Sequence, residues 1–164
     1  MRNQSGYSLL EMLVTIGIVG ALFTVVAQSG LDTNETKKAA KNIVNSLEDE
    51  LTKIKNESLS RSTTTRMVLT NNSGTYTINT YYSSAPTTTC TSGGGTWILI
   101  SSKTLQVNGQ YEVVGNAMAN TCFYRDSSAS GGTYTVEPVD GDSSLPSYDI
   151  TIAVATGYID VTEN

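Results

Sequence analysis

The most unusual chemical group in this chain is one carboxylate, Glu11, at the start of a long apolar segment. The sequence has 164 residues, and no charged side chain occurs between Glu11 and Asp32. As a helix, the 20 residues from 12 to 31 would span about 30 Å, which is the thickness of the hydrocarbon core of a bilayer. A charge at that depth costs on the order of 3 kcal/mol, so Glu11 needs a functional reason to be there.

A cleaved secretory signal peptide is one alternative interpretation of the apolar segment. Residues 27 to 30, Ala-Gln-Ser-Gly, would then supply the small residues of the cleavage site. Two observations favour a retained helix instead. The leader has a single basic residue, Arg2, and Glu11 interrupts the junction between this leader and the apolar segment.

Residues 6 to 14, Gly-Tyr-Ser-Leu-Leu-Glu-Met-Leu-Val, resemble the class III signal of type IV prepilins and of the pseudopilins of type II secretion. The matching positions are Gly6, Ser8, Leu9, Leu10 and Glu11, with Tyr7 in place of the usual phenylalanine. The resemblance implies that a prepilin peptidase in the membrane cuts after Gly6. The same enzyme would then methylate the new N-terminus at Tyr7.

The resemblance also implies an assembly role for Glu11. In a filament, the α-amino group of Tyr7 in one subunit would meet Glu11 of its neighbour. A matched pair of charges in a low dielectric costs much less than an isolated carboxylate, so the pair would penalise any wrong stagger between subunits. Protonation of Glu11 without a partner is the competing hypothesis. The family often has a proline at the position of Gln28, and its absence here also fits minor pilins and pseudopilins.

Residues 40 to 54 carry a second pattern, with apolar side chains spaced three and four apart on one helical face. These are Ala40, Ile43, Val44, Leu47, Leu51 and Ile54. Between residues 31 and 61, six basic and six acidic side chains balance each other. One helix from about residue 8 to 60 would be roughly 80 Å long. We expect its first half to be apolar all round and its second half to pack this stripe against a head.

Residues 62 to 164 form the predicted head, which is rich in Thr, Ser, Gly, Asn and Tyr. Runs of β-branched and aromatic residues predict strands at 67–69, 76–82, 97–100, 133–137, 148–154 and 158–161. The clearest alternation places Tyr148, Ile150, Ile152 and Val154 on one face. The sequence Asn-Asn-Ser-Gly at 71–74 predicts a hairpin turn.

The expected fold class is therefore α+β. A long N-terminal α-helix, with a membrane half and an amphipathic half, would pack on an antiparallel β-sheet head, which is the pilin fold. The expected organisation is a cleaved leader at 1–6, the helix at 7–61 with its transmembrane and assembly segment at 9–30, and the head at 62–164.

The two cysteines, Cys90 and Cys122, predict a disulfide, because a lone pair in an exported protein is most simply joined. The chain has no histidine, which removes Ser-His and Cys-His nucleophiles and most catalytic zinc sites. Oxygen ligands at 140–143 could suggest calcium, but a solvated acidic turn is the simpler interpretation. We expect no enzyme activity, no catalytic residue, no metal and no cofactor.

The charge of the head argues against nucleic acid as a partner. From residue 62 to 164 there are three basic and eight acidic side chains, a net charge of −5. Binding to phosphates needs clusters of basic residues, and the last residues of the chain are acidic instead. We therefore expect no nucleic-acid binding.

The expected function is that of a structural subunit of a type IV pilus, major or minor, which serves adhesion, motility or uptake. Its partners would be further copies of itself, other pilins, the prepilin peptidase and methyltransferase, the inner-membrane assembly platform and the membrane. It would lie in the bacterial inner membrane before assembly and then in an extracellular or periplasmic filament. The alternatives are a minor pseudopilin of a type II secretion system and a membrane-anchored periplasmic binding domain.

Overall fold

The computed structural model describes residues 9–85, 87, 89–90, 96–107, 109–116 and 120–164, without the side chains of Leu9, Glu11 and residues 20–34. The described chain begins with one helix, α1, at Leu9–Ser60. Eight strands follow it: β1 Thr65–Asn72, β2 Thr75–Ser83, β3 Trp97–Gln106, β4 Tyr111–Val114, β5 Thr121–Phe123, β6 Gly132–Pro138, β7 Tyr148–Ile152 and β8 Ile159–Glu163. The chain divides into two compact units, Met1–Thr36 and Lys37–Asn164. The second unit, which we call the head, therefore includes the last part of α1.

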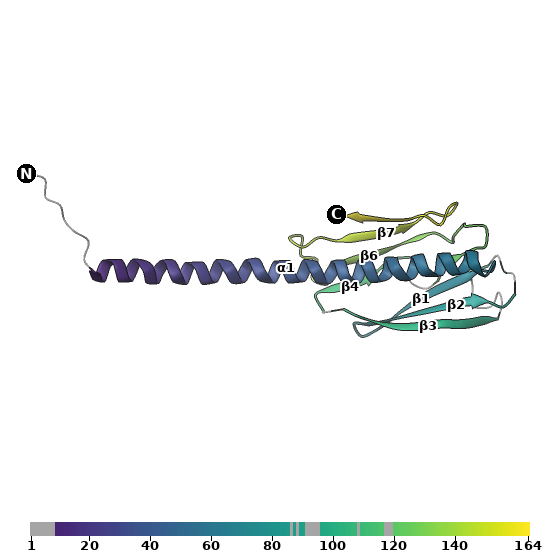
Figure 1. Cartoon of the computed structure of the whole chain (residues 1–164), viewed down its shortest axis with the longest axis horizontal. Helices are drawn as coiled ribbons and strands as arrows, with labels where there is room; N and C mark the ends of the chain where they lie inside the picture. The colour runs from purple at the N-terminus through teal and green to yellow at the C-terminus, as the bar shows by residue number, and fades with distance from the viewer. Residues whose placement is uncertain (1–8, 86, 88, 91–95, 108, 117–119) are drawn as a thin grey trace, which may run out of the picture. The chain divides into compact units, whose positions relative to one another are not determined.

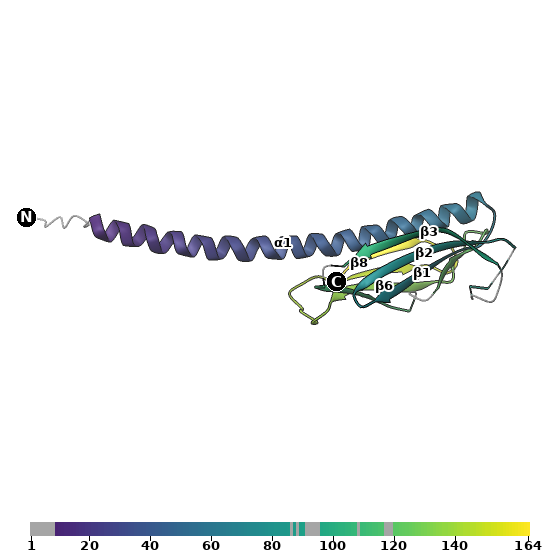
Figure 2. The ribbon, with the colours of Figure 1, turned by 90° about the horizontal axis from the view of Figure 1, so that it is seen from below.

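The strands form two antiparallel sheets of four strands each. Sheet A has the order β3-β2-β1-β5, and sheet B has the order β4-β6-β7-β8. Figure 1 shows sheet A on one side of the α1 segment 37–60 and sheet B on the other, and Figure 2 shows this segment covering one face of the strands. The head thus has two layers, a helix and the strands beneath it.

The core lies between the helix segment and the inner faces of both sheets. The predicted stripe from Ala40 to Ile54 is buried, with exposed fractions of 0–3 %. Facing it are Met67, Leu69, Tyr76, Ile78 and Leu105 from sheet A and Tyr111, Val113, Tyr134, Val136, Tyr148, Ile150 and Ile152 from sheet B. The spacing of three and four therefore predicted the packing face of this helix segment correctly.

The predicted hairpin is present between β1 and β2. The two strands pair from Thr65 opposite Tyr82 to Asn72 opposite Thr75. The turn residues Ser73 and Gly74 both have positive φ, 53° and 86°. This is the backbone geometry of the tight turns that match the twist of antiparallel strands. The backbone N–H of Gly74 donates to Oδ1 of Asn71 at 2.9 Å, which closes the turn.

Three features of the head differ from the prediction. The strand predicted at 148–154 ends at Ile152, and Val154 is 63 % exposed instead of sharing the buried face. Two strands, β4 and β5, were not predicted. Both are short, with four and three residues, and β5 pairs with β1 while β4 pairs with β6. Long-range pairing, rather than a local sequence pattern, therefore determines them.

Candidate functional site

The described side chains at the N-terminal end of α1 form the most unusual surface of the first unit. Large apolar residues here are 52–74 % exposed. They are Leu10, Met12, Leu13, Val14, Ile16, Ile18 and Val19. At 3.6 residues per turn these positions point all round the helix instead of along one stripe. We call this surface the apolar segment. Exposed apolar surface on this scale marks contact with another protein or with lipid.

The predicted processing and assembly residues lie at the edge of this segment. Gly6 and Tyr7 lie outside the described residues. Glu11 belongs to α1, but its side chain also lies outside the described part of the chain. The roles of Gly6, Tyr7 and Glu11 therefore stay predictions.

The membrane-spanning prediction has a related outcome. Within the part of the chain that the structure describes, no helix combines the length and the apolar character needed to cross a membrane. The side chains of residues 20–34, which include much of the predicted span, lie outside that part.

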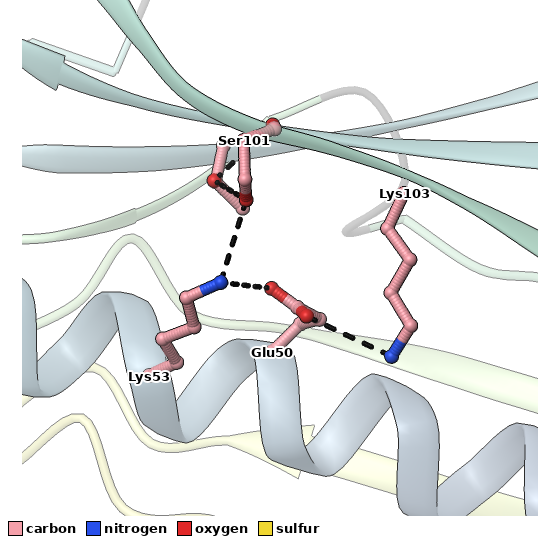
Figure 3. Close-up of polar contacts among 5 residues, drawn as sticks. Glu50, Lys53, Ser101 and Lys103 are labelled. Atoms are coloured by element: carbon pink, nitrogen blue, oxygen red, sulfur yellow. Dashed lines mark hydrogen bonds and ion pairs between the residues drawn. The ribbon is translucent and has the colours of Figure 1, made fainter.

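In the head, a polar cluster fixes α1 against the outer strand of sheet A (Figure 3). The carboxylate of Glu50 is buried to 8 % exposure and lies between two ammonium groups. Nζ of Lys53 is 3.3 Å from its Oε2, and Nζ of Lys103, on β3, is 3.7 Å from its Oε1. Because both lysines stay partly exposed, the carboxylate gains two partners while their positive charges remain hydrated.

The cluster continues into sheet A. Nζ of Lys53 donates to Oγ of Ser101 at 3.4 Å, and Oγ of Ser101 lies 2.8 Å from Oγ1 of Thr80 on β2. These contacts link one turn of α1 to both β3 and β2. Sequence reasoning missed this cluster, because only the spacing of Glu50 and Lys53 was visible. Lys103 joins through the register of β3, which no local pattern indicates.

The predicted disulfide is present in the head. Cys90 and Cys122 are joined, with their Cα atoms 5.7 Å apart and 32 positions apart in sequence. Cys122 lies on β5 and is fully buried. The bond ties the connection between β2 and β3 to the opposite edge strand of the same sheet. Closing a loop of this length stabilises a fold by roughly 3–4 kcal/mol.

Arg66 forms a second feature of sheet A that the sequence did not indicate. Its guanidinium lies 5.0 Å from the ring centroid of Tyr81 and 4.4 Å from that of Trp97. The residue is 7 % exposed, and its buried Nε has no hydrogen-bond partner among the residues that the structure describes. Burial lowers the pKa of Arg66, and the nearby Tyr81 partly offsets this effect. The two rings supply the cation with π-faces where a carboxylate would otherwise be needed.

A groove lies where α1 ends. Its volume is about 670 Å³, and its lining includes residues 62–64, Tyr124, Arg125, Asp126 and Ser128. Ser128 donates to the carboxylate of Asp126 through both its hydroxyl and its backbone N–H, which lowers the pKa of Asp126. The groove is therefore rich in hydroxyl groups, and a hydrogen-bonded turn lies at its rim.

The described residues provide no group of three or more metal-ligating side chains. In the acidic turn considered for calcium, Asp142 accepts a hydrogen bond from the backbone N–H of Ser144 at 2.9 Å. The side-chain hydrogen bond from Ser144 and this backbone contact lower the pKa of Asp142. Such self-contained hydrogen bonding is typical of a solvated acidic turn.

Comparison with known families places a motif on the first residues of the chain. A family model described as "Prokaryotic N-terminal methylation motif" matches residues 1–27. This stretch contains the predicted class III signal and runs into the apolar segment. The prepilin signal expected from residues 6 to 14 is therefore confirmed.

Two solved structures share the fold at low sequence identity. The minor pseudopilin EpsH of the type 2 secretion system of Vibrio cholerae has a TM-score of 0.52 and 11 % identity, covering 75 % of this chain and 95 % of that one. The type IV minor pilin FimU of Pseudomonas aeruginosa (strain PAO1) has a TM-score of 0.52 and 11 % identity, covering 80 % of this chain and 90 % of that one. No curated protein is similar enough to this sequence to count as a match.

These comparisons confirm the expected fold class, a long helix with antiparallel sheets as in pilins. The chain is pilin-like in its N-terminal motif and in its fold, and its two structural neighbours are a pilus protein and a secretion protein.

Proposed function

We propose that this chain is a structural subunit of a type IV pilus, major or minor, that assembles through its N-terminal helix. The observation that carries the proposal is the methylation motif at residues 1–27, which overlaps a helix with apolar side chains exposed all round. Exposure of such a surface to water is unfavourable, because burial of each side chain of this size lowers the free energy by about 1.5–3 kcal/mol. Lipid can cover it before assembly, and the helices of neighbouring copies can cover it in a filament.

In this proposal, a prepilin peptidase removes residues 1–6 and methylates Tyr7. The new amine of one subunit then pairs with Glu11 of the next. An unpaired carboxylate in an apolar surrounding is expensive, so correct stagger is favoured over every stagger that leaves Glu11 alone. The subunit would reside in the inner membrane, where it would bind the assembly platform and other pilins. It would then be incorporated into a filament outside that membrane.

The head would have a structural rather than a catalytic role. It combines a well-packed core, a disulfide and a net negative charge, all of which suit an exposed fibre surface. A disulfide persists outside the reducing cytosol, which agrees with a filament that leaves the inner membrane.

The first experiment determines the mature N-terminus. The protein is isolated from the membranes and the sheared fibres of its own bacterium and analysed by mass spectrometry. We expect an N-methylated Tyr7 as the first residue. A chain that starts near residue 29 or 30 would show cleavage of an ordinary signal peptide and would reject the proposal.

The second experiment tests the pairing of Glu11. We expect Glu11→Ala to be processed normally but to be lost from filaments. Glu35→Ala is the matched control, because it removes an exposed carboxylate from the same helix beyond the apolar segment. Filaments that contain Glu11→Ala at the normal level would reject the pairing.

A minor pseudopilin of a type II secretion system is the second candidate, and its support is the shared fold with such a protein. Deletion of the gene separates the two candidates. A pilus subunit should change the number of surface fibres seen by electron microscopy and leave exoprotein secretion intact. A pseudopilin should block secretion and leave surface fibres unchanged.

A further inference from the structure

Each sheet of the head ends in one strand that faces solvent. β3 is an outer strand of sheet A, and β8 is an outer strand of sheet B. Most residues of β3 and all of β8 except Ile159 are exposed. The other two outer strands differ, because β5 is buried and β4 is buried or half-buried. Within the described residues, β3 and β8 therefore offer the accessible rows of backbone N–H and C=O groups.

Both exposed edges carry apolar side chains. On β3, Ile98 and Leu99 are 40 % and 53 % exposed. On and next to β8, Val161 and Tyr158 are 36 % and 61 % exposed. An exposed strand edge with apolar side chains is suited to pairing with another strand, since main-chain hydrogen bonds give affinity and side chains give specificity.

The charges of the two edges are opposite. Lys103 is the charged residue of β3, and Asp160 and Glu163 are those of β8. Two β3 edges would bring lysines together, and two β8 edges would bring four carboxylates together. Like charges on paired strands are destabilising, whereas opposite charges stabilise the pair. The charges therefore disfavour β3 with β3 and β8 with β8, and favour β3 with β8.

The internal contacts of these charges are weak enough to be shared. Lys103 lies 3.7 Å from Glu50, and Glu163 lies 3.9 Å from Lys41, with the side chains of Lys103 and Glu163 43 % and 56 % exposed. A lysine has three donors, so Lys103 can keep Glu50 and still meet a second carboxylate. Lys103 and Glu163 lie on the core-side faces of their strands, since they pair opposite the buried residues Ile78 and Tyr148.

We propose that β8 of one copy of this chain adds to β3 of the next copy, so that sheet B of one head continues sheet A of its neighbour. This inference rests on the proposed function, because a filament holds copies side by side. β8 has five residues and β3 has ten, so β8 can pair along its whole length. The two edges lie on opposite sides of the α1 segment 37–60 (Figure 1). The contact therefore joins two different edges. Any row of copies keeps one free β3 edge and one free β8 edge at its ends, so the contact gives an open row instead of a closed dimer.

The test uses full-length chains co-produced in their own bacterium. One chain carries Ser102→Cys and the other carries Thr162→Cys, two exposed polar positions on the faces of β3 and β8 that point away from the core. A short bifunctional thiol reagent tolerates a difference in register. We expect a cross-linked dimer only when both chains are present. The matched control replaces Thr162→Cys with Val139→Cys, an exposed position outside β3 and β8, and should give no dimer.

A charge reversal tests the specificity of the contact. We expect Glu163→Lys to lower the cross-linking yield about fivefold, the scale of one cross-strand charge pair, because Glu163 is the acidic residue of β8 on the same face as Lys103. Asp140→Lys makes the same change of charge in an exposed turn away from β8 and should leave the yield unchanged. Both substitutions are at exposed positions, so circular dichroism should show an unchanged fold in each.

The outcomes separate this inference from the proposed function. Filaments that contain the chain without the cross-link would overturn the edge pairing and leave the pilus function standing. The cross-link in membranes of cells where the chain enters no filament would support the edge pairing and overturn the pilus function. Cross-linking of Ser102→Cys to a different protein, with none to Thr162→Cys, would also overturn pairing between copies.

Discussion

Two parts of the same helix, α1, differ in whether their apolar side chains are buried within the chain. In the segment 37–60, one stripe is buried against two sheets and the remaining surface is charged. In the apolar segment near the N-terminus, side chains such as Leu13 and Ile16 are exposed on every side. The first part finds its packing partners within the chain, and the second part must find them outside it. The periodicity of apolar residues therefore distinguishes the part of α1 that packs within the chain from the part that is available for assembly.

The largest expected effect contrasts a leucine from each part. Leu51→Ala removes a fully buried side chain, so it should lower the free energy of unfolding of the head by about 3 kcal/mol. Leu13→Ala truncates an exposed leucine and should change that value by less than about 0.5 kcal/mol. Urea unfolding of the detergent-solubilised chain, followed by the fluorescence of Trp97, measures both. Equal effects of the two variants would contradict the difference in burial between the two parts of α1.

The next effect concerns the disulfide, which belongs to the head alone. Replacing both cysteines, Cys90→Ser with Cys122→Ser, should lower the free energy of unfolding by roughly 3 kcal/mol, because the unfolded chain loses a closed loop. The same unfolding experiment measures it. Processing of the N-terminus should not change, since that reaction occurs in the other unit. A double variant with unchanged stability would show that the loop closure contributes nothing to the head.

A smaller effect should appear at high pH. Burial raises the pKa of Tyr134, and its hydrogen bond to Thr121 offsets only part of this shift. Because the folded pKa lies above the unfolded value of about 10, the stabilisation is complete below pH 10 and is lost as the pH rises further. At pH 11 we expect a loss of about 1 kcal/mol. Tyr134→Phe should show a shallower decline between pH 9 and pH 11, and an identical decline would contradict this assignment.

The smallest effects compare two ion pairs on the helix. Glu50→Gln removes a buried carboxylate between two ammonium groups and should cost about 1 kcal/mol. Lys41→Ala breaks the exposed pair with Glu163, at 3.9 Å, and should cost less than about 0.5 kcal/mol. Thermal unfolding in low and in high salt measures both. Equal costs would show that burial of Glu50 does not strengthen its contacts.

Local patterns predicted those parts of the fold that depend on sequence neighbours. The stripe from Ala40 to Ile54 follows from helical periodicity, and the alternation of Tyr148, Ile150 and Ile152 follows from strand periodicity. The hairpin turn at Ser73 and Gly74 follows from its turn residues. The prepilin signal was recognisable for a similar reason, because its glycine and glutamate have a fixed spacing.

The features that escaped prediction depend on contacts between distant residues. β5 has three residues and is defined by its pairing with β1. Lys103 reaches Glu50 only because the register of β3 places it opposite the helix. Arg66 is buried although a charged residue in a strand suggests an exposed position, and its guanidinium lies over the rings of Tyr81 and Trp97. In each case the determining partner lies far away in sequence, where a local pattern carries no information.

The unlike outer strands of the two sheets also suggest a way to stop growth. A short synthetic peptide with the sequence of residues 158–163, Tyr-Ile-Asp-Val-Thr-Glu, would occupy the free β3 edge of a head. The peptide carries no second sheet, so no further copy of the chain would add at the occupied β3 edge. Such a peptide would act as a terminator, and a peptide copying β3 would terminate the opposite end.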